Sequence, residues 1–273
     1  MAEFGPKVAS AAGIATSFSA RHLGEKFGGN GPLFAAALND IHAGKIDITY
    51  IGATGCKQVD PVFQAALGGK AKRLFPIASP ACTTCVEFSD GKLMLNDLAA
   101  CEEVTWDRLL EYVGETVLDQ ELKAARFISA VNWGKLSHAG PIWSNLAARL
   151  ANLGVPAKQV IYFMDLAEFE SRPATDREDL ISRLPAITRQ CNTIMSLNLK
   201  EAWQLAEVFG GAFQGRKEAM DVAELAAFLY SRIERGPREC PSQWRGCVRR
   251  GQWYRLCAGA LLPRTAHLYR GWR

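Results

Sequence analysis

Hydrophobic and polar positions along the chain fall into blocks that predict strands separated by helices. Apolar runs typical of buried strands occupy residues 46–55, 126–133, 160–166 and 192–198. Amphipathic or capped helical patterns occupy residues 105–117, 141–154, 199–209 and 221–233. Strands that alternate with helices in this order predict an α/β fold, with a parallel sheet covered on both faces.

Two local signals add detail to this pattern. Residues 83–95 form two strand-like halves joined through Asp90 and Gly91, which is a strong β-hairpin signal. Thr105 predicts the N-cap of the helix that follows. That helix places its apolar side chains on one face: Trp106, Leu109, Leu110, Val113 and Val117.

A glycine-rich loop precedes one further helix. Residues 27–38, FGGNGPLFAAAL, place Gly28, Gly29 and Asn30 directly before a helix that starts near Pro32. Glycines let the backbone approach a ligand without a Cβ in the way, and an Asn side chain both donates and accepts hydrogen bonds. The segment therefore predicts a ligand-binding loop at a helix N-terminus. An ordinary Asn-capped helix after a glycine turn is the alternative.

Polar residues stand at the ends of three predicted strands. They are Asn132, Asp165 and Asn198. Ligands of parallel sheets bind at the carboxyl ends of the strands, so these three residues are candidates for a site. Asp165 also fits a strand-end turn. The charged residues that follow it fit a solvated segment: Glu168, Glu170 and Arg172.

The NLKE run supports two interpretations. Asn198 and Glu201 have the spacing of a capping box, and Asp221 and Glu224 show the same spacing where no ligand is suspected. After a strand, however, an Asn and a Glu at the start of a helix can also hold a hydrated Mg²⁺ beside nucleotide phosphates.

Composition excludes several classes of protein. A chain of 273 residues with 48% hydrophobic content can bury a large core as one α/β domain, with or without a small appendage. No apolar run approaches the ~18 residues of a membrane span, and Glu3 and Lys7 interrupt any signal-peptide core. We therefore expect a cytoplasmic location and no membrane partner. The eight cysteines are expected to be reduced, and Cys82 and Cys85, the only CxxC pair, lack the second ligand pair of a zinc site.

Charge divides the chain into residues 1–236 and residues 237–273. The second part holds eight Arg and one acidic residue, a net charge of +7, whereas the first part carries −3. The second part also holds three Trp and three Cys and shows no convincing apolar periodicity. We therefore expect a folded domain over residues 1–236 and a poorly ordered, Arg- and Trp-rich tail over residues 237–273.

The order of the motifs resembles the ribokinase-like carbohydrate kinases of the PfkB type, over roughly residues 1–233. The resemblance rests on a series of segments: GGNGPLFAAAL, DITYIGATG, VEFSDGKLML, VNW, FMDLAEFESR and MSLNLKEAWQLAEVFG. It implies a three-layer α/β/α fold with a mostly parallel central sheet and a small β lid. It also implies ATP-dependent transfer of a phosphoryl group to a sugar hydroxyl, a reaction that depends on positioning and charge neutralisation.

The resemblance further implies a sugar site. Gly28, Gly29 and Asn30 match the family's sugar-binding signature, and Asn132 stands where the family contacts the sugar. The expected partner is a small sugar that the sequence does not identify. A homodimer is also compatible with the resemblance, because lids of this kind often pair between protomers.

The resemblance implies a nucleotide and metal site as well. Asn198 and Glu201 match the family's NxxE motif, which organises Mg²⁺ and the phosphates of ATP. Glu201 and Asp165 are the expected metal-binding carboxylates.

The chain departs from the resembled family at both ends, so we expect the fold to be incomplete there. Relatives begin with a strand that supplies an Asp to the sugar, and Met1 follows that position. Relatives also carry a GAGD run whose Asp is the general base and whose glycine amides form an anion hole, and no GxGD run occurs here. We therefore expect a carbohydrate kinase by descent that has no catalytic base and is inactive as printed.

Three interpretations of the tail remain open. In the first, a frameshift between about residues 233 and 251 has replaced the native end, since codons for residues 267–273 read one nucleotide later permit Ile-Ser-Thr-Gly-Gly-Gly-Asp. In the second, the tail is native and binds nucleic acid through Arg and aromatic side chains. In the third, the chain is a non-catalytic sugar-binding or scaffold protein. We prefer the first, because basic nucleic-acid-binding tails usually mix in Lys and lack this Cys content.

Resequencing of the gene tests the frameshift interpretation. We expect a one-nucleotide slip upstream of the His267 codon, and we expect the corrected frame to encode a Thr-Gly-x-Gly-Asp run. A confirmed reading frame, together with a tail that resists protease in a cooperatively unfolding protein, would show that the tail is native.

Overall fold

The computed structural model describes residues 1–211, 222–235 and 254–257. The predicted cap Asp221 and most of the tail lie outside the described residues. The described helices are α1 (Phe4–Ser10), α2 (Asn30–Ile41), α3 (Pro61–Leu67), α4 (Trp106–Val113), α5 (Glu115–Ala124), α6 (Ala139–Asn152), α7 (Ala174–Gln190), α8 (Leu199–Val208) and α9 (Val222–Arg235). The described strands are β1 (Thr49–Gly52), β2 (Gly55–Cys56), β3 (Arg73–Ala78), β4 (Cys82–Phe88), β5 (Gly91–Asp97), β6 (Phe127–Ala130), β7 (Ile161–Asp165), β8 (Asn192–Leu197) and β9 (Tyr254–Cys257).

The alternation of strands and helices confirms the predicted α/β class. Strands β6, β7 and β8 pair in parallel, and β9 adds to β8 in the antiparallel direction. A second sheet pairs β1 with β3 in parallel and β3 with β2 antiparallel. Parallel pairing follows from the helices between the strands, because a parallel connection needs a crossover of a dozen residues or more.

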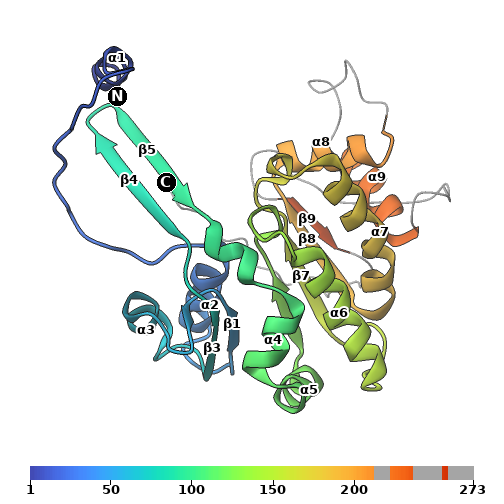
Figure 1. Ribbon diagram of the computed structural model, residues 1–273. Coiled ribbons are helices and arrows are strands. Elements are labelled where there is room, and N and C mark those ends of the chain that lie inside the picture. The colour runs from blue at the N-terminus through green and yellow to red at the C-terminus, as the bar shows by residue number, and fades with distance from the viewer. Residues whose placement is uncertain (212–221, 236–253, 258–273) are drawn as a thin grey trace.

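The strands therefore lie in two separate sheets, which Figure 1 shows as two groups. Among the described strands, β1 ends one sheet and β6 ends the other. Both of these strands line one cavity of about 3060 Å³. The expectation that the fold is incomplete stays a prediction.

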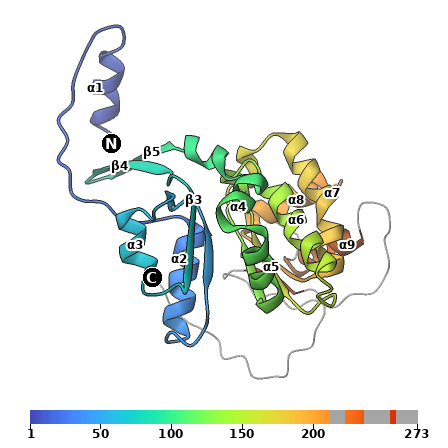
Figure 2. The same cartoon turned by 60° about the horizontal axis from the view of Figure 1, so that its bottom comes forward.

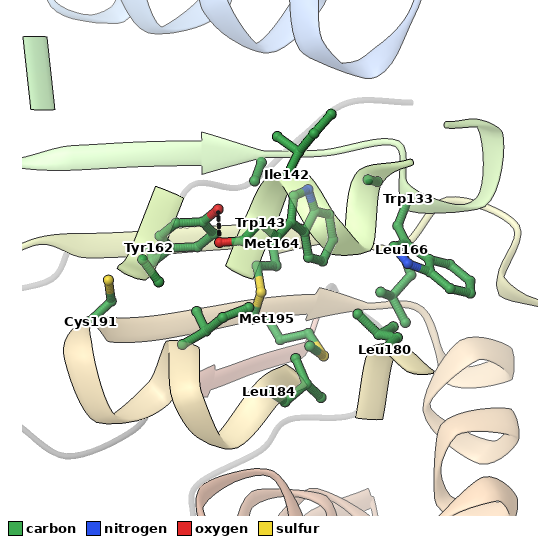
Figure 3. Close-up of a cluster of buried hydrophobic side chains, with 14 of the residues drawn as sticks. Trp133, Ile142, Trp143, Tyr162, Met164, Leu166, Leu180, Leu184, Cys191 and Met195 are labelled. Carbon is green, nitrogen blue, oxygen red and sulfur yellow. Dashed lines mark hydrogen bonds between the residues drawn. The ribbon is translucent and has the colours of Figure 1, made fainter. Parts of the chain in front are cut away.

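Strand β7 shows how the sheet is covered on both faces. Its buried residues alternate with half-buried ones, as the two-residue period of a strand requires. Tyr162 packs on the α6 side, where its hydroxyl donates to the carbonyl oxygen of Trp143 at 3.3 Å (Figure 3). Phe163 faces the other way and stacks on Phe34 of α2, with ring centroids 5.2 Å apart. Helices thus pack on both faces, and the expected three-layer arrangement is present.

The predicted hairpin is confirmed as β4 and β5, which pair from Cys82 with Asp97 to Phe88 with Gly91. The hairpin projects from the rest of the molecule, and α1 lies near its tip (Figures 1 and 2). Most of its residues are exposed, including Leu93, Met94 and Leu95. It has the position and size expected of a small lid.

The helix predicted after Thr105 is shorter than expected. Thr105 caps α4 by accepting a hydrogen bond from the backbone N–H of Arg108. The helix ends at Gly114, whose φ of +79° lies in the region that favours glycine. Val117 therefore belongs to α5, and its assignment to the same helix as Trp106 was wrong.

Within the tail, residues 254–257 form β9, which the hydrophobic pattern did not predict, and β9 pairs with β8. The expected domain boundary and the order of the tail stay predictions. Over the described residues, the structure contains no helix that is long and apolar enough to cross a membrane.

Candidate functional site

The predicted site residues all line the cavity between the two sheets. They are Gly28, Gly29, Asn30, Asn132, Asp165, Asn198 and Glu201. Parallel strands β6, β7 and β8 bring the last four residues to one edge, because each follows or ends a strand that runs in the same direction. The structure thus brings the candidates together, although the role of each one stays a prediction.

Asn30 does not cap its helix, so the alternative interpretation of the glycine loop is wrong. Gly29 holds the N-cap position of α2 with φ +89° and makes no side-chain capping bond. The side-chain amide of Asn30 instead donates to Oδ2 of Asp165 at 2.7 Å. The bond joins the start of α2 to the end of β7.

Asp165 carries a partly desolvated carboxylate. Burial raises the pKa of this carboxyl above its usual value, and the hydrogen bond from Asn30 opposes the shift. Among the described residues, no Lys, Arg or His forms an ion pair with Asp165. The Asp165 carboxylate therefore lines the cavity with one hydrogen-bond partner, the neutral amide of Asn30.

Asn132 adopts a left-handed backbone, with φ +67°, directly after β6. Asn is one of the few residues other than Gly that tolerate this conformation. No hydrogen bond to its side-chain amide is present in the described part of the chain, so donors and acceptors of this group remain available to a ligand.

Asn198 and Glu201 form the capping box that their spacing predicts. The side-chain oxygen of Asn198 accepts from the backbone N–H of Glu201 at 2.9 Å, and Oε2 of Glu201 accepts from the backbone N–H of Asn198 at 2.9 Å. Oε1 of Glu201 also accepts from the backbone N–H of Glu168 at 3.3 Å. Glu201 is buried, with 6% exposure, and burial raises the pKa of its carboxyl above the usual value.

The donor set fits a hydrated Mg²⁺ better than a metal enclosed by protein ligands. Over the described residues, no group of three or more His, Cys, Asp or Glu side chains could hold a metal ion. Mg²⁺ commonly keeps several waters and takes one or two carboxylates together with substrate phosphates. Glu201 at the N-terminus of α8 would supply one such carboxylate. Cys82 and Cys85 are free and exposed on β4.

Comparison with known proteins identifies the family. A family model described as prokaryotic ketohexokinase matches residues 10–234. The chain belongs to the prokaryotic ketohexokinase family. It is therefore a carbohydrate kinase at the level of its family, and the predicted resemblance to PfkB-type sugar kinases is confirmed. Searches of the curated proteins and of the solved structures find no significant match.

In this ketohexokinase-family chain, Arg172 holds the loop that follows β6. Its guanidinium donates to the carbonyl oxygens of Trp133 and Leu136 at 2.9 Å and of Ser137 at 2.8 Å, and it pairs with Asp176. It also lies 4.7 Å from the centroid of a Trp133 ring. The side chain is only 11% exposed. The interpretation of Arg172 as a solvated residue was therefore wrong, because the carbonyl groups that it binds lie 35 to 39 residues away, too far to be recognised in the sequence.

Gly134 brings the loops after β6 and β7 into direct contact. Its backbone N–H donates to the carbonyl oxygen of Leu166 at 2.6 Å, and its carbonyl oxygen accepts from the hydroxyl of Ser171 at 3.0 Å. A Cβ at this position would lie 1.9 Å from the carbonyl oxygen of Ala167. Only glycine fits here, and apart from the position of Gly134 after Asn132 and Trp133, no pattern in the sequence indicates this requirement.

Lys135 and Glu168 extend the contact between these two loops. They form an ion pair and both line the cavity. Glu168 has φ +60° and Ala167 has φ +47°, so two successive residues hold a left-handed backbone. The backbone N–H of Glu168 reaches Glu201, which links these loops to the start of α8. The segments that follow β6, β7 and β8 are therefore linked to one another along one side of the cavity.

Substitution of Gly134 tests this contact. We expect Gly134→Ala to lower the free energy of unfolding by about 1–3 kcal/mol, because the added methyl group collides with a backbone carbonyl that other contacts hold. Chemical denaturation measures the loss. Gly69→Ala is the control, since a Cβ at Gly69 meets nothing within 4 Å. Equal stability of the two variants would contradict the proposed contact.

Proposed function

We propose that the chain is the sugar-kinase domain of a ketohexokinase, which binds a ketohexose and Mg²⁺–ATP in the cavity between its two sheets. The observation that carries the proposal is the convergence of the loop residue Asn30 with Asn132, Asn198 and Glu201 on that cavity. The family supports a sugar as substrate and phosphoryl transfer as the reaction.

The sugar is assigned to the side of the cavity near α2. Gly28 and Gly29 keep the loop free of side chains, so that a sugar can approach the backbone. Asn30 and Asn132 offer amide groups that donate and accept hydrogen bonds, which matches the mixed donor and acceptor character of hydroxyl groups. Such contacts would orient one hydroxyl toward the phosphoryl donor.

The nucleotide phosphates and Mg²⁺ are assigned to the start of α8. Backbone N–H groups and the helix dipole favour anions at a helix N-terminus. Bound Mg²⁺ neutralises charge on the phosphates during transfer. Glu201, held by Asn198 and by the backbone of Glu168, is the residue of this chain that would bind the hydrated ion.

We further propose that the chain as printed does not phosphorylate sugars. Its sequence contains no GxGD run, which in the resembled kinases carries the general base and the anion hole. General bases contribute about 10²- to 10⁴-fold to such rates, and an anion hole contributes about 10²- to 10³-fold more. The proposed binding residues Asn30, Asn132 and Glu201 are present, so we expect the chain to bind its substrates.

The first test is turnover with ATP, Mg²⁺ and a panel of ketohexoses, other hexoses, pentoses and nucleosides. We expect no product above background from the chain as printed, although Mg²⁺–ATP and a ketohexose should bind in calorimetry. A chain whose tail is replaced by the corrected reading frame is the positive control and should gain activity. Robust turnover by the printed chain would overturn the proposed inactivity.

The second test separates the cap from the metal role of Glu201. Gln preserves a capping box, whereas Ala removes it. Glu201→Gln can keep the bond from the backbone N–H of Asn198, but its NH2 group cannot accept from the backbone N–H of Glu168, so we expect a smaller loss in the free energy of unfolding than in Glu201→Ala. We expect Glu201→Gln to lower affinity for Mg²⁺–ATP at least tenfold, because the negative charge is lost. Glu201→Ala should also weaken Mg²⁺–ATP binding, and it should lower the free energy of unfolding by about 1 kcal/mol.

Calorimetric titration and thermal unfolding measure the two effects. In an active chain with the corrected frame, the same Gln variant should lower kcat, whereas Asn30→Ala should mainly raise KM for the sugar. If Glu201→Gln bound Mg²⁺–ATP normally, the residue would be a cap and nothing more.

A further inference from the structure

The hydrogen bond between Asn30 and Asp165 gives Asp165 a partner that the sequence did not predict. The two residues are 135 positions apart, and they meet because α2 begins where β7 ends. Asn30 is a predicted sugar residue, whereas Asp165 was expected to bind Mg²⁺. Their contact places Asp165 on the sugar side of the cavity.

The contacts of Asp165 do not favour a metal. The amide hydrogen that Asn30 directs at Oδ2 carries a positive partial charge, which opposes a cation bound at the same oxygen. Over the described residues, no group of three or more His, Cys, Asp or Glu side chains that includes Asp165 could hold a metal ion.

The same contacts do favour a ligand with hydroxyl groups. A carboxylate can accept about four hydrogen bonds. In the described residues, the carboxylate of Asp165 accepts one, from the amide of Asn30. The Asn30 amide keeps a second N–H and its carbonyl oxygen. The pair therefore presents donors and acceptors side by side, as two adjacent sugar hydroxyls require, since each hydroxyl donates once and also accepts.

Desolvation strengthens this argument. Asp165 is half-buried, and burial raises the pKa of its carboxyl, so the charged group is less hydrated than at the surface. Hydroxyl donors from a ligand would replace that water with hydrogen bonds to a charged acceptor, which are among the stronger hydrogen bonds in proteins.

We infer that Asp165 accepts hydrogen bonds from sugar hydroxyls and, together with Asn30, forms the subsite for two adjacent hydroxyls of the ketohexose. Asp165 is then a residue that determines sugar specificity, in place of the metal ligand expected from the sequence. The inference rests on the proposed function, because it requires that the cavity binds a sugar.

The test is calorimetric titration of the purified chain with D-fructose, without nucleotide and in the presence of a chelator that removes Mg²⁺. We expect Asp165→Asn to weaken fructose binding about 10- to 100-fold, the range that charge-assisted hydrogen bonds support. The variant keeps the shape of the side chain and its bond to Asn30. Affinity for Mg²⁺–ATP should stay within twofold.

Two controls accompany this variant. Asp179→Asn makes the same chemical change on α7, where Asp179 pairs with Arg183 and does not line the cavity, and it should leave fructose affinity unchanged. Asn30→Ser removes the other half of the subsite and should also weaken fructose binding at least fivefold, so the inference stays testable if Asp165→Asn fails to fold. Thermal unfolding checks each variant.

Deoxy sugars make the assignment specific to hydroxyl groups. Among monodeoxy fructoses, at least one should bind the unaltered chain more weakly than fructose and should show no further loss with Asp165→Asn. Such coupling identifies the hydroxyl that Asp165 contacts.

The outcomes separate the inference from the proposed function. Fructose affinity that survives both Asp165→Asn and Asn30→Ser would overturn the inference alone. Loss of Mg²⁺–ATP affinity in Asp165→Asn with intact fructose binding would restore the metal role. An unaltered chain that binds no fructose or other ketohexose would overturn the proposed function, and the inference with it.

Discussion

The backbone of Gly134 lies against the carbonyl groups of Leu166 and Ala167, and the arrangement of the site depends on this approach. Strands β6 and β7 are neighbours, so the loops that leave them compete for the same space at the sheet edge. Absence of a side chain at residue 134 lets the loops pack backbone to backbone. Arg172 then fixes the first loop by binding three of its carbonyl oxygens, and Glu201 binds the second. Because these loops are already ordered, the protein loses less conformational entropy when a ligand binds.

The two sheets are connected differently. Strands within each sheet share backbone hydrogen bonds, whereas β1 and β6 share none. Side chains connect the parts of the molecule that carry the two sheets. Asn30 at the start of α2 donates to Asp165 at the end of β7, and Thr49 of β1 donates to Glu121 of α5 at 2.5 Å. Side-chain bonds of this kind contribute about 1 kcal/mol each, far less than a full strand pairing. A ligand that contacts both sides of the cavity would therefore stabilise the relation between the sheets as well as occupy the site.

Sequence reasoning succeeded where the cause is local. Periodicity located strands β6, β7 and β8 of the larger sheet, and the NLKE spacing predicted the cap of α8. It failed where proline or distant contacts decide the structure. Pro76 lies within β3 and Pro185 within α7, although proline disfavours the interior of both kinds of element. The partners of Arg172 at Trp133 and Ser137 lie 39 and 35 residues away, so no local pattern could reveal them.

The capping box at Asn198 does not account for Glu201 by itself. A helix cap contributes about 1 kcal/mol and does not require a buried carboxylate. Asp60, for example, caps the short helix α3 from a half-buried position. Glu201 is instead almost fully buried, and burial, with the negative charge of Asp165 nearby, raises the pKa of its carboxyl despite the backbone hydrogen bonds that favour its charge. Burying a carboxylate costs several kcal/mol when no cation balances it. The positive end of the α8 dipole offsets only part of that cost. A cation on the cavity side would offset the rest of that cost, which supports the proposed position of Mg²⁺ beside Glu201.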